Sequence, residues 1–250
     1  MLKIGDKKLI NAWAFYDWAN SVYTLTIASS IFPIFYSALF ADQLQKNIPA
    51  FGMVFKSTAL ITYVTAFTFL VVTFTSPILS GIADYVGNKK NFMKFFCYVG
   101  SAGCIGLYWF SLENIHLSLL FYFMGLIGYW GSLVFYNSYL PDIAYPEQQD
   151  RISAKGFSMG YLGSVLLLLL NLAMVMKPNW FGFDISISDN LRQTGTEVQI
   201  LEALKAAKDN ASIEAMRVAF ITVGLWWIIF SQYSFYILPK GISKGHKVTT

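Results

Sequence analysis

The sequence has 250 residues, of which 56% are apolar and only 13% are Asp, Glu, Lys or Arg. A soluble globular domain has about a quarter charged residues, so this composition excludes an ordinary soluble domain. The formal net charge of +4 is modest, and the basic residues fall in short segments between apolar runs, which excludes a nucleic-acid-binding surface. The sequence has no cluster of Cys, His, Asp and Glu at metal-ligand spacing, so neither a metal nor another cofactor is expected.

Six long uncharged stretches divide the chain. A helix needs about 20 apolar residues to cross a hydrocarbon core of about 30 Å, and five of the six stretches reach that length. One such stretch could be a buried soluble helix, but six in succession predict an all-α, polytopic membrane protein. The six-helix bundle is predicted to fill residues 1–239, with spans at about 13–41, 57–83, 93–112, 117–140, 156–176 and 218–238.

The distribution of Lys and Arg predicts the orientation of these spans, because short cytoplasmic loops are enriched in basic residues. If the N-terminus is cytoplasmic, the inner segments carry 11 basic residues and the outer segments carry seven, five of them in the long segment 177–217. Long loops contribute little to this bias. Both termini are therefore predicted to be cytoplasmic, and the membrane is predicted to be the inner, or cell, membrane of a bacterium.

The segment 177–217 has soluble character and is predicted to be an extracytoplasmic loop. Within it, Thr196–Ala207 can form an amphipathic helix whose apolar face includes Val198 and Leu201. This helix is expected to lie on the membrane surface, and a lid that captures a solute is the alternative. Residues 240–250 are basic and polar, and we interpret them as a cytoplasmic tail or as a truncated linker.

The first span carries the sharpest polar pattern within the membrane region. Asp17, Asn20, Ser21 and Thr24 follow the spacing i, i+3, i+4 and i+7, which places them on one face of a helix. Polar side chains within a span usually face the protein interior or a watery path. A carboxylate beside an amide and two hydroxyls could bind an ammonium group, a cation or a proton. Alternatively, Asp17 lies near the inner headgroups and pairs with a Lys or Arg of a loop.

Two further candidates for a solute cavity lie in the fourth and fifth spans. Tyr129 lies deeper in the membrane than Tyr139, which an interfacial aromatic belt explains. In the fifth span, Asn171 shares a helix face with Gly160 and Ser164, and its amide could bond to a neighbouring helix or to a solute. Small residues four apart also let helices approach closely, so helix packing is the alternative for this face and for Tyr129.

An enzyme is disfavoured, although Gly156–Gly160 matches the G-x-S-x-G pattern of a nucleophile elbow. That motif requires a preceding strand and a histidine base within reach. Here a charged loop precedes the motif and a membrane span follows it. The two histidines, His116 and His246, are expected on the opposite side of the membrane and in the tail, so no catalytic role is assigned.

Four passages carry motifs beyond apolar composition: Trp13–Tyr23, Ser76–Lys90, Phe135–Ala144 with Arg151–Gly163, and Trp226–Pro239. Together they resemble the vacuole-effluxer family of the major facilitator superfamily. The first and third passages are quite specific to this family. The second resembles the loop motif that the whole superfamily carries between helices 2 and 3.

The resemblance implies two inverted three-helix repeats that form the N-terminal half of the family's usual twelve-helix protein. The substrate site would face a second bundle, so a second six-helix half or a second copy of the chain is the expected partner. The loop motif implies a gate role for Asp84, Gly87 and Lys89, with the partner of Asp84 in the second half. Gly87 also suits a tight turn, since glycine adopts positive φ, and Lys89 and Lys90 are expected at the inner headgroups.

The resemblance further implies a secondary transporter of small solutes that works by alternating access, with amino acids favoured as the solute. Asp17, Asn20 and Ser21 are the first candidates for contacts with that solute, followed by Tyr129 and Asn171. Besides the solute, the lipid bilayer is the expected partner. A non-transporting membrane module that assembles with a partner chain is the alternative function.

Overall fold

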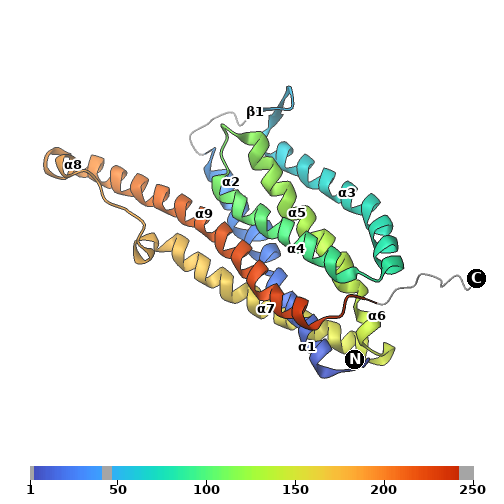
Figure 1. The fold of residues 1–250 in the computed structure, drawn as a ribbon. Helices are drawn as coiled ribbons and strands as arrows, with labels where there is room; N and C mark the ends of the chain where they lie inside the picture. The colour runs from blue at the N-terminus through green and yellow to red at the C-terminus, as the bar shows by residue number, and fades with distance from the viewer. Residues whose placement is uncertain (1–2, 41–46, 242–250) are drawn as a thin grey trace, which may run out of the picture.

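The computed structural model describes residues 3–40 and 47–241 and shows a bundle of long helices (Figure 1). The first span is made of three consecutive helical segments. These are the α-helix α1 (Lys7–Asn20), the π-helix η1 (Tyr23–Ile31) and the α-helix α2 (Phe32–Ala38). A short antiparallel hairpin follows, in which β1 (Asn47–Ala50) pairs with β2 (Met53–Lys56). The sequence pattern did not predict this hairpin.

The remaining elements are helical and connected by short turns. They are α3 (Ser57–Val86), α4 (Lys89–Gly106), η2 (Leu107–Trp109), α5 (Ile115–Ser138), α6 (Leu140–Ile143), α7 (Pro146–Met176), η3 (Pro178–Phe181), α8 (Asp189–Thr194) and α9 (Glu197–Ile237). Pro141 and Pro146 lie in the first turns of α6 and α7, where a missing N–H breaks no helical hydrogen bond.

Five helical segments of the described chain are long and apolar enough to cross a membrane: Lys7–Ala38, α3, Ile115–Ile143, α7 and α9. The remaining long helix, α4, has only 18 residues and carries Lys89, Lys90 and Lys94 near its start. It nevertheless packs against α5 and α9 inside the bundle (Figure 1). The prediction of an all-α membrane bundle is therefore confirmed.

The helix contacts follow the arrangement expected of two three-helix repeats. In the first repeat, α1 packs against α7 and α9, which belong to the second repeat. In the second repeat, α5 packs in the same way against α3 and α4 of the first. The two third helices, α4 and α9, run side by side (Figure 1). The first helix of each repeat, α1 or α5, thus packs against helices of the other repeat. This arrangement fits the inverted repeats from which many transporters build one bundle.

Glycines bring α4 and α5 into close contact. A Cβ atom at Gly103 would lie 2.5 Å from the backbone nitrogen of Gly125, and one at Gly128 would press on the Cα atom of Gly100. Small residues allow such backbone contact, which gives dispersion energy that lipid cannot replace. Our sequence analysis assigned this packing role to the fifth span and missed it in the third and fourth.

Cationic side chains bond to backbone carbonyl oxygens at both ends of the α4–α9 pair. The Lys90 ammonium, near the start of α4, donates hydrogen bonds to the carbonyl oxygens of Phe235 and Leu238 at the end of α9. The Arg217 guanidinium of α9 donates to the carbonyl oxygen of Phe110 after η2, at 2.9 Å. The last carbonyls of a helix have no intrahelical partner and carry partial negative charge, so a cation stabilises them. The Lys90 ammonium thus bonds to the end of α9 within this chain.

The long polar segment also differs from its prediction. Thr196 caps a helix that continues without a break to Ile237, so Thr196–Ala207 is the first part of α9 and not a separate surface helix. The Thr196 and Gln199 side chains form a capping box that fixes this start. No Pro or Gly interrupts the chain before Gly224, so nothing stops the helix. The start of α9 therefore projects beyond the bundle together with α8 (Figure 1).

Candidate functional site

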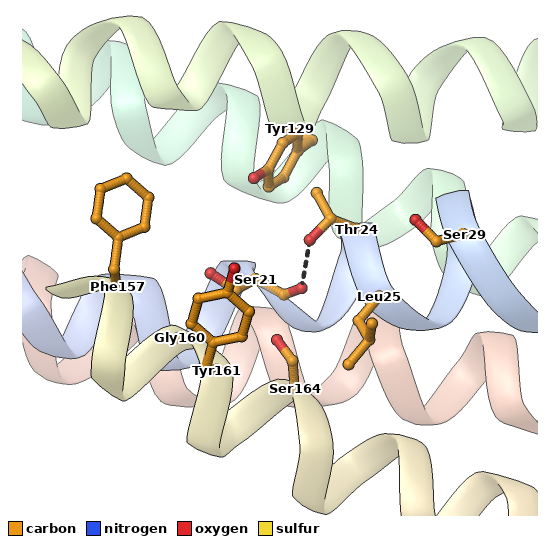
Figure 2. A pocket seen from close by; sticks show the side chains of 9 residues that line it. All are labelled: Ser21, Thr24, Leu25, Ser29, Tyr129, Phe157, Gly160, Tyr161 and Ser164. Atoms are coloured by element: carbon orange, nitrogen blue, oxygen red, sulfur yellow. Dashed lines mark hydrogen bonds between the residues drawn. The ribbon is translucent and has the colours of Figure 1, made fainter. Parts of the chain in front are cut away.

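A cavity of about 300 Å³ opens between the first span, α5 and α7 (Figure 2). Most of its lining side chains carry hydroxyl groups or aromatic rings. The lining residues are Ser21, Thr24, Leu25, Ser29, Tyr129, Phe157, Gly160, Tyr161 and Ser164. Phe157 and Tyr161 are 66% and 70% exposed, so they form the open mouth of the cavity.

The π-helix η1 places hydroxyls along one wall of this cavity. Thr24 and Ser29 are five residues apart, and both line the cavity. An i to i+5 spacing brings side chains onto one face in a π-helix, whereas an α-helix would separate them. The Thr24 hydroxyl donates a hydrogen bond to the carbonyl oxygen of Ser21 at 2.8 Å (Figure 2). Such local π-helices are frequent at functional sites.

Asp17 lies one helical turn before Ser21 and is 8% exposed. Its carboxylate accepts a hydrogen bond from the Tyr136 hydroxyl at 2.8 Å. A Cβ atom at Gly156 would lie 2.7 Å from the same carboxylate oxygen, so only glycine lets α7 approach it so closely. Gly160, which lines the cavity, also lies close to the first span: a Cβ atom there would be 2.5 Å from the Ser21 hydroxyl and 3.4 Å from the Cβ atom of Asp17. Within residues 3–40 and 47–241, Asp17 forms no ion pair with a Lys or Arg.

Tyr136 is held in a fixed position against Asp17. The Trp13 ring stacks on the Tyr136 ring at 4.3 Å between centroids, with 8° between the planes. The Trp13 indole N–H also donates to the backbone carbonyl of Tyr136 at 2.9 Å. Tyr136 was not among the residues predicted for the cavity. The available signal was its spacing of seven residues from Tyr129, which puts both tyrosines on one face of α5.

The other predicted cavity residues lie elsewhere. Asn20 is fully buried and does not line the cavity, although its side-chain oxygen accepts a hydrogen bond from Ser21 at 3.3 Å. Asn171 is also fully buried, and its side-chain oxygen accepts from Thr222 at 3.0 Å, which joins α7 to α9. Of the five predicted residues, the structure therefore places Ser21 and Tyr129 in the lining and Asp17 beside it.

The glycine–serine–glycine pattern of the fifth span lies inside a helix. Gly156–Gly160 is part of α7, and helical residues of α7 rather than a strand come directly before it. The Ser158 hydroxyl donates to the carbonyl oxygen of Ala154 at 2.9 Å, a common arrangement for serine in a helix. The described residues also contain no group of three His, Cys, Asp or Glu side chains that could hold a metal ion.

The gate motif forms a compact ionic cluster at the end of the bundle where α1 begins. The Lys89 ammonium lies 3.1 Å from an Asp84 carboxylate oxygen and 2.8 Å from one of Asp142. It also donates to the carbonyl oxygen of Ser138 at 3.0 Å. Gly87 ends α3 with a φ of 69°, as its predicted turn requires, and this turn brings Lys89 back towards Asp84.

The cluster adds two details that the motif alone did not show. Lys89 is 3% exposed, so the rest of this chain covers it. Asp84 has a partner within this chain, since Lys89 pairs with it five residues later. Sequence reasoning missed Asp142, which lies 53 residues beyond Lys89 and meets it only through the fold. Burial of a charged side chain is costly unless it is paired, and the second carboxylate completes the pairing.

Comparison with known proteins gives an independent view of this chain. Residues 5–250 match the family model described as vacuole effluxer Atg22 like. An uncharacterized MFS-type transporter of Bacillus subtilis (strain 168), YxiO, is 34% identical over 178 residues, which cover 71% of this chain and 40% of the relative. This chain thus spans less than half of the relative's length, and no solved structure matches it. The chain belongs to the vacuole effluxer Atg22-like family of the major facilitator superfamily.

Proposed function

We propose that this chain is one bundle of a secondary transporter that moves small solutes by alternating access. The cavity between the first span, α5 and α7 is then its part of the solute site. The observation that carries this proposal is the Asp17 carboxylate, which lies beside the open cavity without an ion pair among the described residues. Acidic side chains inside a membrane bundle are rare and mark solute or ion pathways.

The chemistry of the cavity suits a small polar solute that carries an amine. Hydroxyls of Ser21, Thr24 and Tyr129 both donate and accept hydrogen bonds, so they can replace part of a solute's hydration shell. The Asp17 carboxylate accepts hydrogen bonds only, and it can bind an ammonium group or a proton. An amino acid combines these needs, and the family resemblance favours the same solute.

A second bundle is needed to close this cavity. Its mouth, formed by the exposed side chains of Phe157 and Tyr161, is open within this chain. Only 11% of the most apolar part of α3 is buried within this chain. Large side chains are therefore exposed, and the exposed fraction of Phe74 is 72%. Alternating access requires two bundles that move about a central site. We therefore propose that a second six-helix half, or a second copy of this chain, covers this face.

The ionic cluster suits a gate at the cytoplasmic end of the transporter. Lys89 links the end of α3 and the start of α4 to Asp142 in α6. We assign this end to the cytoplasm because it carries the basic segments expected there. The cluster then makes α3, α4 and α6 move as one unit when the bundles rock.

Thiol labelling of the cavity wall tests this proposal. The test protein is a chimaera that joins this chain to the remaining part of the Bacillus subtilis relative. Thr24→Cys should react with a water-soluble thiol reagent applied to both membrane faces, because a solute cavity is filled with water. Leu166→Cys is the control: Leu166 lies on the opposite face of α7 and is 53% exposed. We expect this face to contact lipid, so the cysteine should react slowly.

The native cysteines give a low background in this measurement. Cys97 and Cys104 are both fully buried and form no disulfide. Labelling of Thr24→Cys that is as slow as that of Leu166→Cys would show that the cavity is dry. That result would contradict a solute pathway along the first span.

A further inference from the structure

A second cavity, of about 520 Å³, lies between α1, α7 and α9. We call it the α7–α9 groove. Its polar lining residues are Asn11, Lys155 and Tyr233, and its apolar lining includes Phe15, Met159 and Phe230. The groove shares no lining residue with the solute cavity, and it plays no part in the proposed transport function.

The two cavities lie on opposite sides of α7. Lys155 and Met159 are four residues apart and share one helix face. Tyr161 and Ser164 line the solute cavity and lie roughly half a turn away from that face, since each residue advances the helix by roughly 100°. A second bundle that covers the solute cavity would therefore leave the α7–α9 groove open to lipid.

Lys155 is at the start of the apolar part of α7 and extends its ammonium towards Asn11, on the headgroup side of Asp17. It is the last charged residue before the uncharged stretch Gly156–Met176, which is long enough to cross the hydrocarbon core. Its ammonium donates a hydrogen bond to the side-chain oxygen of Asn11. A lysine ammonium has three N–H donors, so two remain for a further acceptor. Tyr233, 45% exposed, adds a hydroxyl on the α9 side, as is usual for tyrosines at a membrane interface.

The charge of the groove selects for an anion. Among the described residues that line the groove, only Lys155 has a charged side chain. Arg151 precedes Lys155 by one turn on the same face of α7, and Lys8 precedes Asn11 by nearly one turn on α1. Both side chains are exposed, so they extend the positive charge from the groove towards the aqueous side. Basic pockets between transmembrane helices bind acidic lipid headgroups for this reason.

We propose that the α7–α9 groove binds one anionic phospholipid. The phosphate is held by Lys155 and the Asn11 amide, and an acyl chain lies along Phe15, Met159 and Phe230. A zwitterionic lipid gains less, because its choline group cancels the charge of its phosphate. The aromatic rings give the acyl chain a defined surface. The Phe15 ring packs edge to face against the rings of Phe230 and Tyr233, with 6.1 Å and 5.1 Å between the ring centroids.

Spin-labelled lipids test this proposal on the full 250-residue chain in phosphatidylcholine bilayers. We expect spin-labelled phosphatidylglycerol to associate about fivefold more tightly than spin-labelled phosphatidylcholine, the effect of one basic side chain at the surface. Lys155→Gln should remove most of this preference, whereas Lys155→Arg should keep it. Lys208→Gln is the matched control, because Lys208 is exposed on the projecting part of α9 and outside the groove.

A second variant separates the groove from the charge alone. Met159→Trp fills the apolar part and leaves Lys155 in place, so it should also reduce phosphatidylglycerol binding. Inorganic phosphate at millimolar concentration should not displace the lipid, since it lacks the acyl chain. The proposal is overturned if Lys155→Gln and Lys208→Gln give equal preference, if Met159→Trp has no effect, or if a cysteine at Met159 cross-links two copies of the chain.

Discussion

Replacing Asp17 with Asn is expected to reduce solute uptake by the chimaera about 10- to 100-fold. Asn has the same shape and still accepts the hydrogen bond from Tyr136, which is 2.8 Å away in the wild-type chain. It removes the negative charge that we propose binds the solute amine or a proton. A hydrogen bond to a charged group contributes about 1.5–3 kcal/mol, which corresponds to this range of rates.

The control for this prediction is Asp209→Asn, which removes an exposed charge on the projecting part of α9. It should leave uptake unchanged. The amount of each protein in the membrane must be measured beside its uptake. If Asp17→Asn is lost from the membrane while Asp209→Asn is retained, Asp17 is needed for folding and its assignment to the solute site is wrong.

Replacing Gly128 with Ala is expected to destabilise the bundle by about 3 kcal/mol, near the upper end for overpacking. The added methyl group would meet the Cα atom of Gly100 and lie 2.7 Å from the carbonyl oxygen of Phe96. Both are backbone atoms of α4, so no side chain can rotate away. The helices must separate, and the contact between them is lost along their length.

Gly81→Ala provides a matched control for this substitution. Gly81 is also inside a long helix, but a Cβ atom there would have no neighbour within 4 Å. Its replacement should be neutral or stabilise the protein by up to about 1 kcal/mol, because alanine favours the helix. The measurement is the fraction of folded, monodisperse protein in detergent after heating. Equal melting of the two variants would contradict the packing role of Gly128.

The long apolar stretches predicted the membrane bundle because a span must be both long and uncharged. Such a pattern depends on local composition and needs no knowledge of neighbouring helices. The same reasoning failed for Thr196–Ala207, because a change from polar to apolar composition does not interrupt a helix. Only a helix-breaking residue would have ended it, and the segment contains none.

The site was predicted less completely than the fold. Helical spacing shows which side chains share a face, but it does not show which helix that face meets. Asn20 and Asn171 were therefore placed in a cavity, whereas the structure buries them. The π-helical spacing of Ser29 and the pairing of Lys89 with Asp142 depend on contacts that no sequence window contains.

Uptake of amino acids into proteoliposomes tests the central claim most directly. Liposomes that contain the 250-residue chain alone would be compared with liposomes that contain the chimaera at the same protein amount, using a mixture of radiolabelled amino acids. We predict uptake by the chimaera and none by the monomeric chain alone, because one bundle cannot alternate access to its cavity. Uptake by the chain alone, as a monomer and at the rate of the chimaera, would contradict this account.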